Sequence, residues 1–261
     1  MVRQMSTGPE RIAAAFERDG AAFMPYMMGG YPTLEKSLQI GEQYIAGGAD
    51  LIELGIPFSD PLADGPAIHA AGTQALRAGA TVDTVLEICE QLGARIPVVV
   101  MTYSNIVLAK GAGAFARRLR DCGASGLIVP DLPLEESEEI RTACEQAGIA
   151  FIPLVAPTTT DERLKAIGEQ ASGFLYAVSV VGTTGERTKT DAYEEVLDRA
   201  KKYSDVPVAL GFGVSSPDQA VVAASAGADG VIVGTRMVRA VADGEDIEAL
   251  VGDFAKALSP A

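Results

Sequence analysis

Three carboxylates between residues 51 and 66 are the side chains of this chain best suited to proton transfer. The segment reads LIELGIPFSDPLADGP, with Glu53 inside an apolar run and with Asp60 and Asp64 in the loop that follows. Side chains alternate between the two faces of a strand, so Glu53 and Ile52 lie on opposite faces. If outer helices cover the Ile52 face, Glu53 points into the fold, where apolar surroundings raise a carboxyl pKa toward neutrality. The alternative is a buried Glu that is held by structural hydrogen bonds.

The ends of the later apolar runs supply further polar and aromatic side chains. They are Tyr103, Asn105, Asp131, Tyr176 and Phe212. No Lys is among them, which weighs against Schiff-base chemistry, because that reaction needs a desolvated amine. His69 is the single histidine, so a zinc site lacks its usual partners and no metal is expected. Acid and base catalysis by carboxylates remains.

Glycines in the second half of the chain indicate a phosphate site. They follow three successive apolar runs, at Val181–Gly185, Gly211–Gly213 and Gly234–Thr235. Backbone N–H groups in such loops, together with a helix N-terminus, can hold a phosphate without Lys or Arg. Turns also need glycine, so a single pair would be weak evidence. Three such loops at one rim favour phosphate binding.

The sequence around these carboxylates and glycines predicts a fold of alternating strands and helices. Apolar, β-branched runs predict strands at Ala22–Met28, Asp50–Ile56, Pro97–Tyr103, Gly126–Asp131, Ile149–Val155, Gly173–Ser179, Val206–Phe212 and Gly230–Gly234. Apolar spacings of three and four predict helices at Leu34–Ala46, Val82–Leu92, Ala114–Asp121, Leu134–Gln146, Glu162–Gln170, Tyr193–Tyr203 and Pro217–Ala226. Eight such units predict an α/β fold of one domain over residues 1–261, a (β/α)8 TIM barrel. An extra N-terminal helix is expected at Arg11–Asp19, and an open doubly wound sheet is the alternative fold.

Composition limits the classes of function. The 261 residues carry 35 acidic and 21 basic side chains, a formal charge of -14, which argues against binding nucleic acid or an anionic membrane. We expect a cytoplasmic protein, since the first residues lack the apolar core of a signal peptide and no apolar run is long enough to span a bilayer. The three cysteines form no CxxC pair and are read as core residues in a reducing compartment.

The run from Glu53 to Pro66 closely resembles the signature of the tryptophan synthase α subunit family. The resemblance continues in order along the chain through Ala22–Tyr26, Met101–Asn105, Pro130–Pro133, Gly182–Gly185, Gly211–Ser215 and Gly234–Thr235. It implies a lyase of tryptophan biosynthesis that cleaves indole-3-glycerol phosphate into indole and glyceraldehyde 3-phosphate. This retro-aldol reaction needs neither Lys nor metal, because the protonated indole ring accepts the electrons of the broken bond.

The resemblance also implies roles for individual residues. Glu53 would be the main acid and base, and Asp64 would accept a hydrogen bond from the indole N–H. The residues expected to flank the planar ring are Phe23, Met101, Tyr103, Tyr176 and Phe212. The residues expected to hold the phosphate are Gly185, Gly213, Gly234 and Thr235.

The family resemblance further implies a partner. No cofactor is expected in this chain, whereas a tryptophan synthase β subunit in an α2β2 heterotetramer would carry pyridoxal phosphate and receive the indole. Contact and signalling with that subunit would fall to Asp60, Asn105, Asp131 and Thr184. Two alternatives stay open: a free-standing indole-3-glycerol-phosphate lyase, and a non-catalytic barrel that activates β.

Some positions depart from the usual family pattern. Gly29–Pro32 replaces a frequent Gly-Asp-Pro, Val180 replaces a frequent Arg, and Thr183 and Thr235 replace the common Val and Ser. The intact Glu and Asp pair leaves the expected reaction unchanged. A lost Arg could remove an ion pair that steadies a closed lid, so we expect the loop 181–189 to be mobile without ligand.

Overall fold

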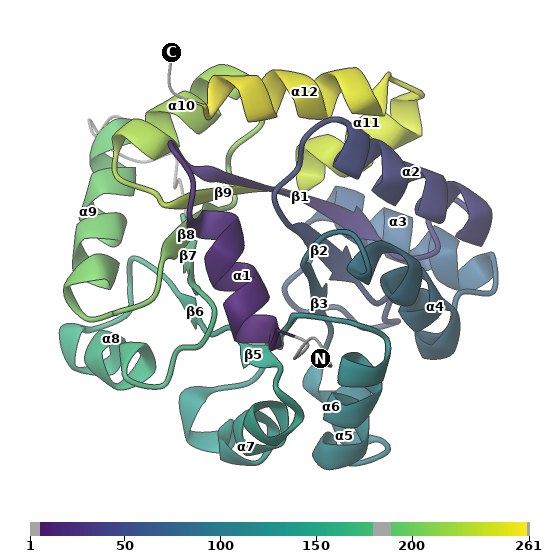
Figure 1. Ribbon diagram of the computed structural model, residues 1–261, viewed down its shortest axis with the longest axis horizontal. Coiled ribbons are helices and arrows are strands. Elements are labelled where there is room, and N and C mark those ends of the chain that lie inside the picture. Colours follow the sequence, from purple (N-terminus) through teal and green to yellow (C-terminus); the bar gives the residue numbers. More distant parts are fainter. Residues whose placement is uncertain (1–5, 180–188, 260–261) are drawn as a thin grey trace, which may run out of the picture.

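The computed structural model describes residues 6–179 and 189–259, which form a ring of parallel strands surrounded by helices (Figure 1). The strands are β1 Ala22–Met28, β2 Ile52–Gly55, β3 Val98–Met101, β4 Gly126–Ile128, β5 Ala150–Phe151, β6 Leu154–Val155, β7 Leu175–Val178, β8 Val208–Gly211 and β9 Gly230–Val233. Their order in the sheet is β5-β4-β3-β2-β1-β9-β8-β7-β6. The first and last strands of this order, β5 and β6, are consecutive along the chain.

The stretch between β5 and β6 closes the barrel. It consists of Ile152 and Pro153, and the predicted strand Ile149–Val155 contains both elements. The Ile152 N–H donates to the Leu127 carbonyl on the β4 side at 3.0 Å, and the Pro153 carbonyl accepts from the Tyr176 N–H on the β7 side at 3.1 Å. Pro153 has no N–H to donate, which accounts for the interruption. The predicted (β/α)8 barrel is confirmed, with its fifth strand divided in two.

Helices cover the outside of the barrel. They are α1 Gly8–Phe16, α2 Leu34–Ala46, α3 Pro66–Arg77, α4 Val82–Gly93, α5 Ser104–Leu108, α6 Ala112–Asp121, the 3-10 turn η1 Leu134–Glu136, α7 Glu138–Ala147, α8 Asp161–Gly168, α9 Lys189–Lys202, α10 Pro217–Ser225, α11 Thr235–Asp243 and α12 Ile247–Ala257. Most predicted helices are found within a few residues of their expected ends, and α2 matches at both ends. The predicted helix Leu134–Gln146 is divided into η1 and α7.

The extra N-terminal helix exists but begins and ends earlier than Arg11–Asp19. Thr7 caps it through a reciprocal pair of hydrogen bonds with Glu10, and the helix ends after Phe16. Arg11 donates to the main-chain carbonyls of Gly93, Ile96 and Gly123, which lie at the end of α4 and in the segments that precede β3 and β4. In Figure 1, α1 crosses the barrel, and these bonds place it over the end opposite the strand carboxyl termini.

The register of the strands decides which side chains face the barrel interior. Tyr26 of β1 pairs with Glu53 of β2, and Glu53 pairs with Val99 of β3, so these residues share one face. Ile52 and Leu54 lie on the other face, in the large apolar cluster between the sheet and the helices. The expectation that helices cover the Ile52 face and leave Glu53 inside is therefore confirmed. No helix among the described residues has the length and apolar character needed to cross a bilayer.

Candidate active site

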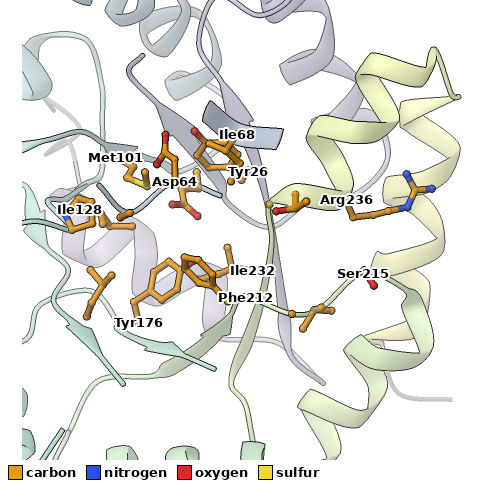
Figure 2. Close-up of a pocket in the computed structure, with 18 of the residues that line it drawn as sticks. Tyr26, Asp64, Ile68, Met101, Ile128, Tyr176, Phe212, Ser215, Ile232 and Arg236 are labelled. Atoms are coloured by element: carbon orange, nitrogen blue, oxygen red, sulfur yellow. The ribbon is translucent and has the colours of Figure 1, made fainter. Parts of the chain in front are cut away.

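A cavity of about 320 Å³ opens at the carboxyl ends of the strands (Figure 2). One end holds two carboxylates, Glu53 and Asp64, and the middle is apolar and aromatic. The cavity is lined by Tyr26, Glu53, Ala63, Asp64, Ile68, Met101, Ile128, Pro130, Leu154, Tyr176, Phe212, Gly213, Val214, Ser215, Ile232, Gly234, Thr235, Arg236 and Arg239. A flat apolar group with a polar substituent at each end would match this distribution of side chains.

Glu53 is the buried acid of the cavity. Its side chain is only 2% exposed, in the middle of β2. Burial, together with the smaller effect of the negative charge of Asp64, raises its pKa to about 8. A carboxyl group that is largely protonated at neutral pH can donate a proton and take one back, as a general acid and base must.

Asp64 lies at the same end of the cavity and is held by Tyr103. The Tyr103 hydroxyl donates to Asp64 Oδ1 at 2.7 Å and accepts from the Ala63 N–H at 3.1 Å. Burial raises the pKa of Asp64, while the Tyr103 hydrogen bond and the nearby His69 act to lower it. The two carboxyls therefore differ in environment: one is almost fully buried, and the other is half-buried and hydrogen-bonded. Such a difference is typical of an acid and base pair with separate tasks.

Three of the five residues expected to flank a planar ring do line the cavity: Met101, Tyr176 and Phe212. The structure corrects the other two placements. Phe23 is fully buried on the helix side of β1 and stacks on Phe254 at 5.3 Å, because it lies one residue out of phase with the inward-facing positions. Tyr103 contacts Asp64 instead of lining the cavity, since its ring packs on Phe58 at 5.3 Å.

Sequence reasoning missed several lining residues. Tyr26 is the most informative of them, because it pairs directly with Glu53 and lies 2% exposed beside it. Strand alternation in β1 could have found it, since Tyr26 is the inward-facing aromatic residue near the carboxyl end of that strand. The apolar wall residues Ile68, Ile128, Leu154 and Ile232 carried no signal that distinguishes them from ordinary core.

The other end of the cavity is suited to an anion. Gly213, Gly234 and Thr235 all line it, as expected, and Gly234 is the residue before the first turn of α11. Ser215 and Gly234, which precede α10 and α11, line the cavity, and helix N-termini attract negative charge. The fourth expected phosphate residue, Gly185, lies outside the described residues, as do Thr184, Thr183, Val180 and nearly all of the loop 181–189.

Two arginines at this end were not anticipated. Arg236 is engaged in a bidentate ion pair with Glu245, at 2.9 and 2.6 Å, and Figure 2 shows its guanidinium turned away from the cavity. Arg239 lies one turn further along α11, lines the cavity and has no ion-pair partner within the described parts of the chain. No group of three or more metal-ligating side chains is found among residues 6–179 and 189–259.

The three described residues expected to contact a partner lie outside the cavity. Asp60 is exposed in the loop after β2, where it accepts from the Ser59 hydroxyl, and the neighbouring Leu62 is 85% exposed. Asp131 accepts from both the main-chain N–H and the hydroxyl of Ser104, which ties the start of α5 to the end of β4. Asn105 lies in that same short helix. Their placement on one rim is compatible with a shared surface.

Comparison with known proteins gives one consistent result. The family model described as "Tryptophan synthase alpha chain" matches residues 12–258. The tryptophan synthase alpha chain of Methanosarcina acetivorans is 43% identical over 97% of this chain and 96% of its own length. The alpha chain of Gloeobacter violaceus is 45% identical over 97% and 95%.

Solved structures agree. A chain of Mycobacterium tuberculosis tryptophan synthase matches with a TM-score of 0.89 at 40% identity, covering 96% of this chain and 99% of that one. The tryptophan synthase alpha subunit of Legionella pneumophila matches with a TM-score of 0.85 at 32% identity, over 95% and 98%.

Proposed function

Because the chain belongs to the tryptophan synthase alpha chain family, a lyase of tryptophan biosynthesis, we propose that Glu53 and Asp64 perform its cleavage of indole-3-glycerol phosphate. The products are indole and glyceraldehyde 3-phosphate. The observation that carries the proposal is a buried carboxyl with a pKa of about 8, placed with a second carboxylate at one end of an apolar cavity.

The ring end of the cavity supports the following proton transfers. Glu53, in its protonated form, donates to indole C3, and the positive charge that develops on the ring nitrogen is stabilised by Asp64 through the N–H. The resulting Glu53 carboxylate takes the proton of the hydroxyl on the carbon attached to C3. The bond between that carbon and C3 then breaks, its electrons restore the neutral indole ring, and the carbon becomes the aldehyde. One proton enters and one leaves, so Glu53 returns to its starting state.

Met101, Tyr176 and Phe212 would contact the indole ring. All three line the cavity, and the Tyr176 and Phe212 rings meet edge to face at 6.4 Å (Figure 2). A planar ring in an apolar slot is oriented by shape and burial, and this orientation brings C3 to the acid. Tyr26 completes the wall beside Glu53.

The phosphate would bind at the opposite end. Main-chain N–H groups of Gly213, Gly234 and Thr235, together with the N-terminus of α11, supply donors without a bound counter-ion. Arg239 adds a positive charge at the edge of this end. Local donors are needed because the chain as a whole carries a formal charge of -14 and repels an anionic substrate at long range.

The family works with a β subunit. We place pyridoxal phosphate on that partner, with indole passed to it in an α2β2 complex in the cytoplasm. The exposed loop that carries Asp60 and Leu62 lies next to the site and supports a contact there. A free-standing lyase would use the same residues, and the paired Glu53 and Asp64 argue against a non-catalytic activator.

The test is indole release from indole-3-glycerol phosphate by the purified chain, with and without a cognate β subunit. Slow release alone that increases strongly with β supports the coupled enzyme, and fast release that β does not change supports the free-standing lyase. Absence of release in both conditions would refute the proposed reaction. The Glu53→Gln variant serves as the blank for the reaction.

A further inference from the structure

Ser179 joins the ends of two neighbouring strands, β7 and β8, next to Phe212 of the cavity wall. It follows β7 directly and is only 5% exposed. Its hydroxyl donates to the Phe212 carbonyl at 2.6 Å, and its main-chain N–H donates to the Gly211 carbonyl at 3.1 Å. Side chain and backbone of one buried serine therefore hold two successive carbonyls at the end of β8.

The residue held in this way has an unusual backbone conformation. Phe212 has φ 69° and is the one non-glycine residue with a positive φ in the described parts of the chain. A bulky residue adopts this conformation only when its surroundings hold it there. Its ring is 45% exposed and lines the cavity next to Tyr176. The Ser179 hydrogen bond is a specific restraint on this conformation.

The same bond fixes the direction of a potential ligand donor. In a trans peptide the C=O and the following N–H point in opposite directions, so the orientation of the Phe212 carbonyl also sets that of the Gly213 N–H. Gly213 lines the cavity with φ 79°, and no acceptor for its N–H is found within residues 6–179 and 189–259. This N–H is thus free to bind an anion.

We propose that Ser179 is a positioning residue for the substrate phosphate, because its hydroxyl holds the Phe212–Gly213 peptide with the Gly213 N–H turned to the ligand. The inference rests on the phosphate site of the proposed function. Without the hydroxyl, the peptide can rotate, since glycine at position 213 tolerates many conformations. A rotated peptide would present the Phe212 carbonyl where the N–H had been, and a carbonyl oxygen repels a phosphate.

The experiment compares Ser179→Ala with Ser137→Ala. Ser137 provides a matched control, because its hydroxyl also donates to a backbone carbonyl, that of Leu134, at 2.7 Å. Ser137 is 1% exposed and does not line the cavity. Both variants lose a short hydrogen bond from a serine hydroxyl to a main-chain carbonyl, and the Ser179 hydroxyl also contacts the Gly211 carbonyl at 3.4 Å. The readouts are kcat and KM for indole-3-glycerol phosphate, Kd for inorganic phosphate, and Kd for indole.

Ser179→Ala is expected to raise both KM and the phosphate Kd about tenfold, the effect of one lost ligand hydrogen bond. The Kd for indole should stay unchanged, and Ser179→Thr, which keeps the hydroxyl, should restore phosphate binding. Equal shifts in Ser137→Ala, or unchanged phosphate binding in Ser179→Ala, would overturn the inference. If Ser179→Ala does not fold, phosphate binding by Ser179→Thr tests the inference instead. Weak phosphate binding by Ser179→Thr would contradict the role of the hydroxyl. A wild-type chain that does not cleave the substrate would instead refute the proposed function.

Discussion

Replacing Glu53 with Gln should abolish activity and at the same time stabilise the protein. Gln keeps the volume of the side chain and removes only the transferable proton, so kcat should fall at least about 100-fold. The change in stability follows from the raised pKa of Glu53, about 8 in the folded state against an ordinary value of 4.5. Between these two values the folded protein retains a proton that the unfolded chain has released. Stability is therefore lost as the pH rises through this range.

The two pKa values of Glu53, folded and unfolded, set the size of the change in stability. The free energy of unfolding of the wild type is lowered by about 1 kcal/mol at pH 5 and by about 4 kcal/mol at pH 8, relative to a side chain that never ionises. Gln is such a side chain. The advantage of the variant over the wild type should therefore grow by roughly 3 kcal/mol between pH 5 and pH 8.

Urea denaturation of both proteins at pH 5 and pH 8 measures this difference, and indole release measures the activity. The comparison cancels the contribution of Asp64, whose carboxyl is present in both proteins. A variant that remains active would show that Glu53 is not the acid and base. A stability difference that is the same at both pH values would refute the raised pKa, even if activity were lost.

Two further predictions concern residues around the site, and a third concerns the N-terminal helix. Tyr103→Phe removes the hydrogen bond that lowers the pKa of Asp64. The acidic limb of the pH–rate profile should therefore move to higher pH. An acidic limb at the same pH as in the wild type would contradict a catalytic role for Asp64. Arg239→Gln should raise KM and make KM less dependent on salt concentration. The control Arg236→Gln should change KM little, because the Arg236 guanidinium is paired with Glu245. Steady-state kinetics at two ionic strengths measure both variants, and equal changes of KM in the two would show that Arg239 does not attract the substrate. Arg11→Gln loses hydrogen bonds to three carbonyls and should lower the free energy of unfolding by about 2–4 kcal/mol with little change in KM. An unchanged denaturation midpoint would show that these hydrogen bonds do not stabilise the protein.

Much of the fold could be predicted from local patterns. The strand β1 and the helix α2 have the predicted ends, because a run of apolar residues and a helical spacing are both properties of neighbouring residues. The N-terminal helix begins earlier than its apolar spacing predicts, because Thr7 and Glu10 form a capping pair at its start. The division of the fifth strand follows from Pro153, which lies inside the apolar run Ile149–Val155 that predicts one continuous strand.

The interior position of Glu53 was also predictable, since alternation along a strand is local. The same alternation in β1 turns Phe23 toward the helices and Tyr26 toward the barrel interior. Gly213, Gly234 and Thr235 were predicted from the family resemblance and from their place after strands, and they lie at one end of the cavity as expected.

Local sequence patterns are sufficient to predict the alternation of strands and helices, the inward face of Glu53 and the glycine-bearing ends of the last strands. Tertiary contacts alone bring Tyr103 to Asp64 and Ser179 to Phe212. The physical reason is distance along the chain. Side-chain direction within one strand is fixed by its own backbone, whereas a hydrogen bond between residues more than thirty positions apart depends on how the closed barrel brings strand ends together.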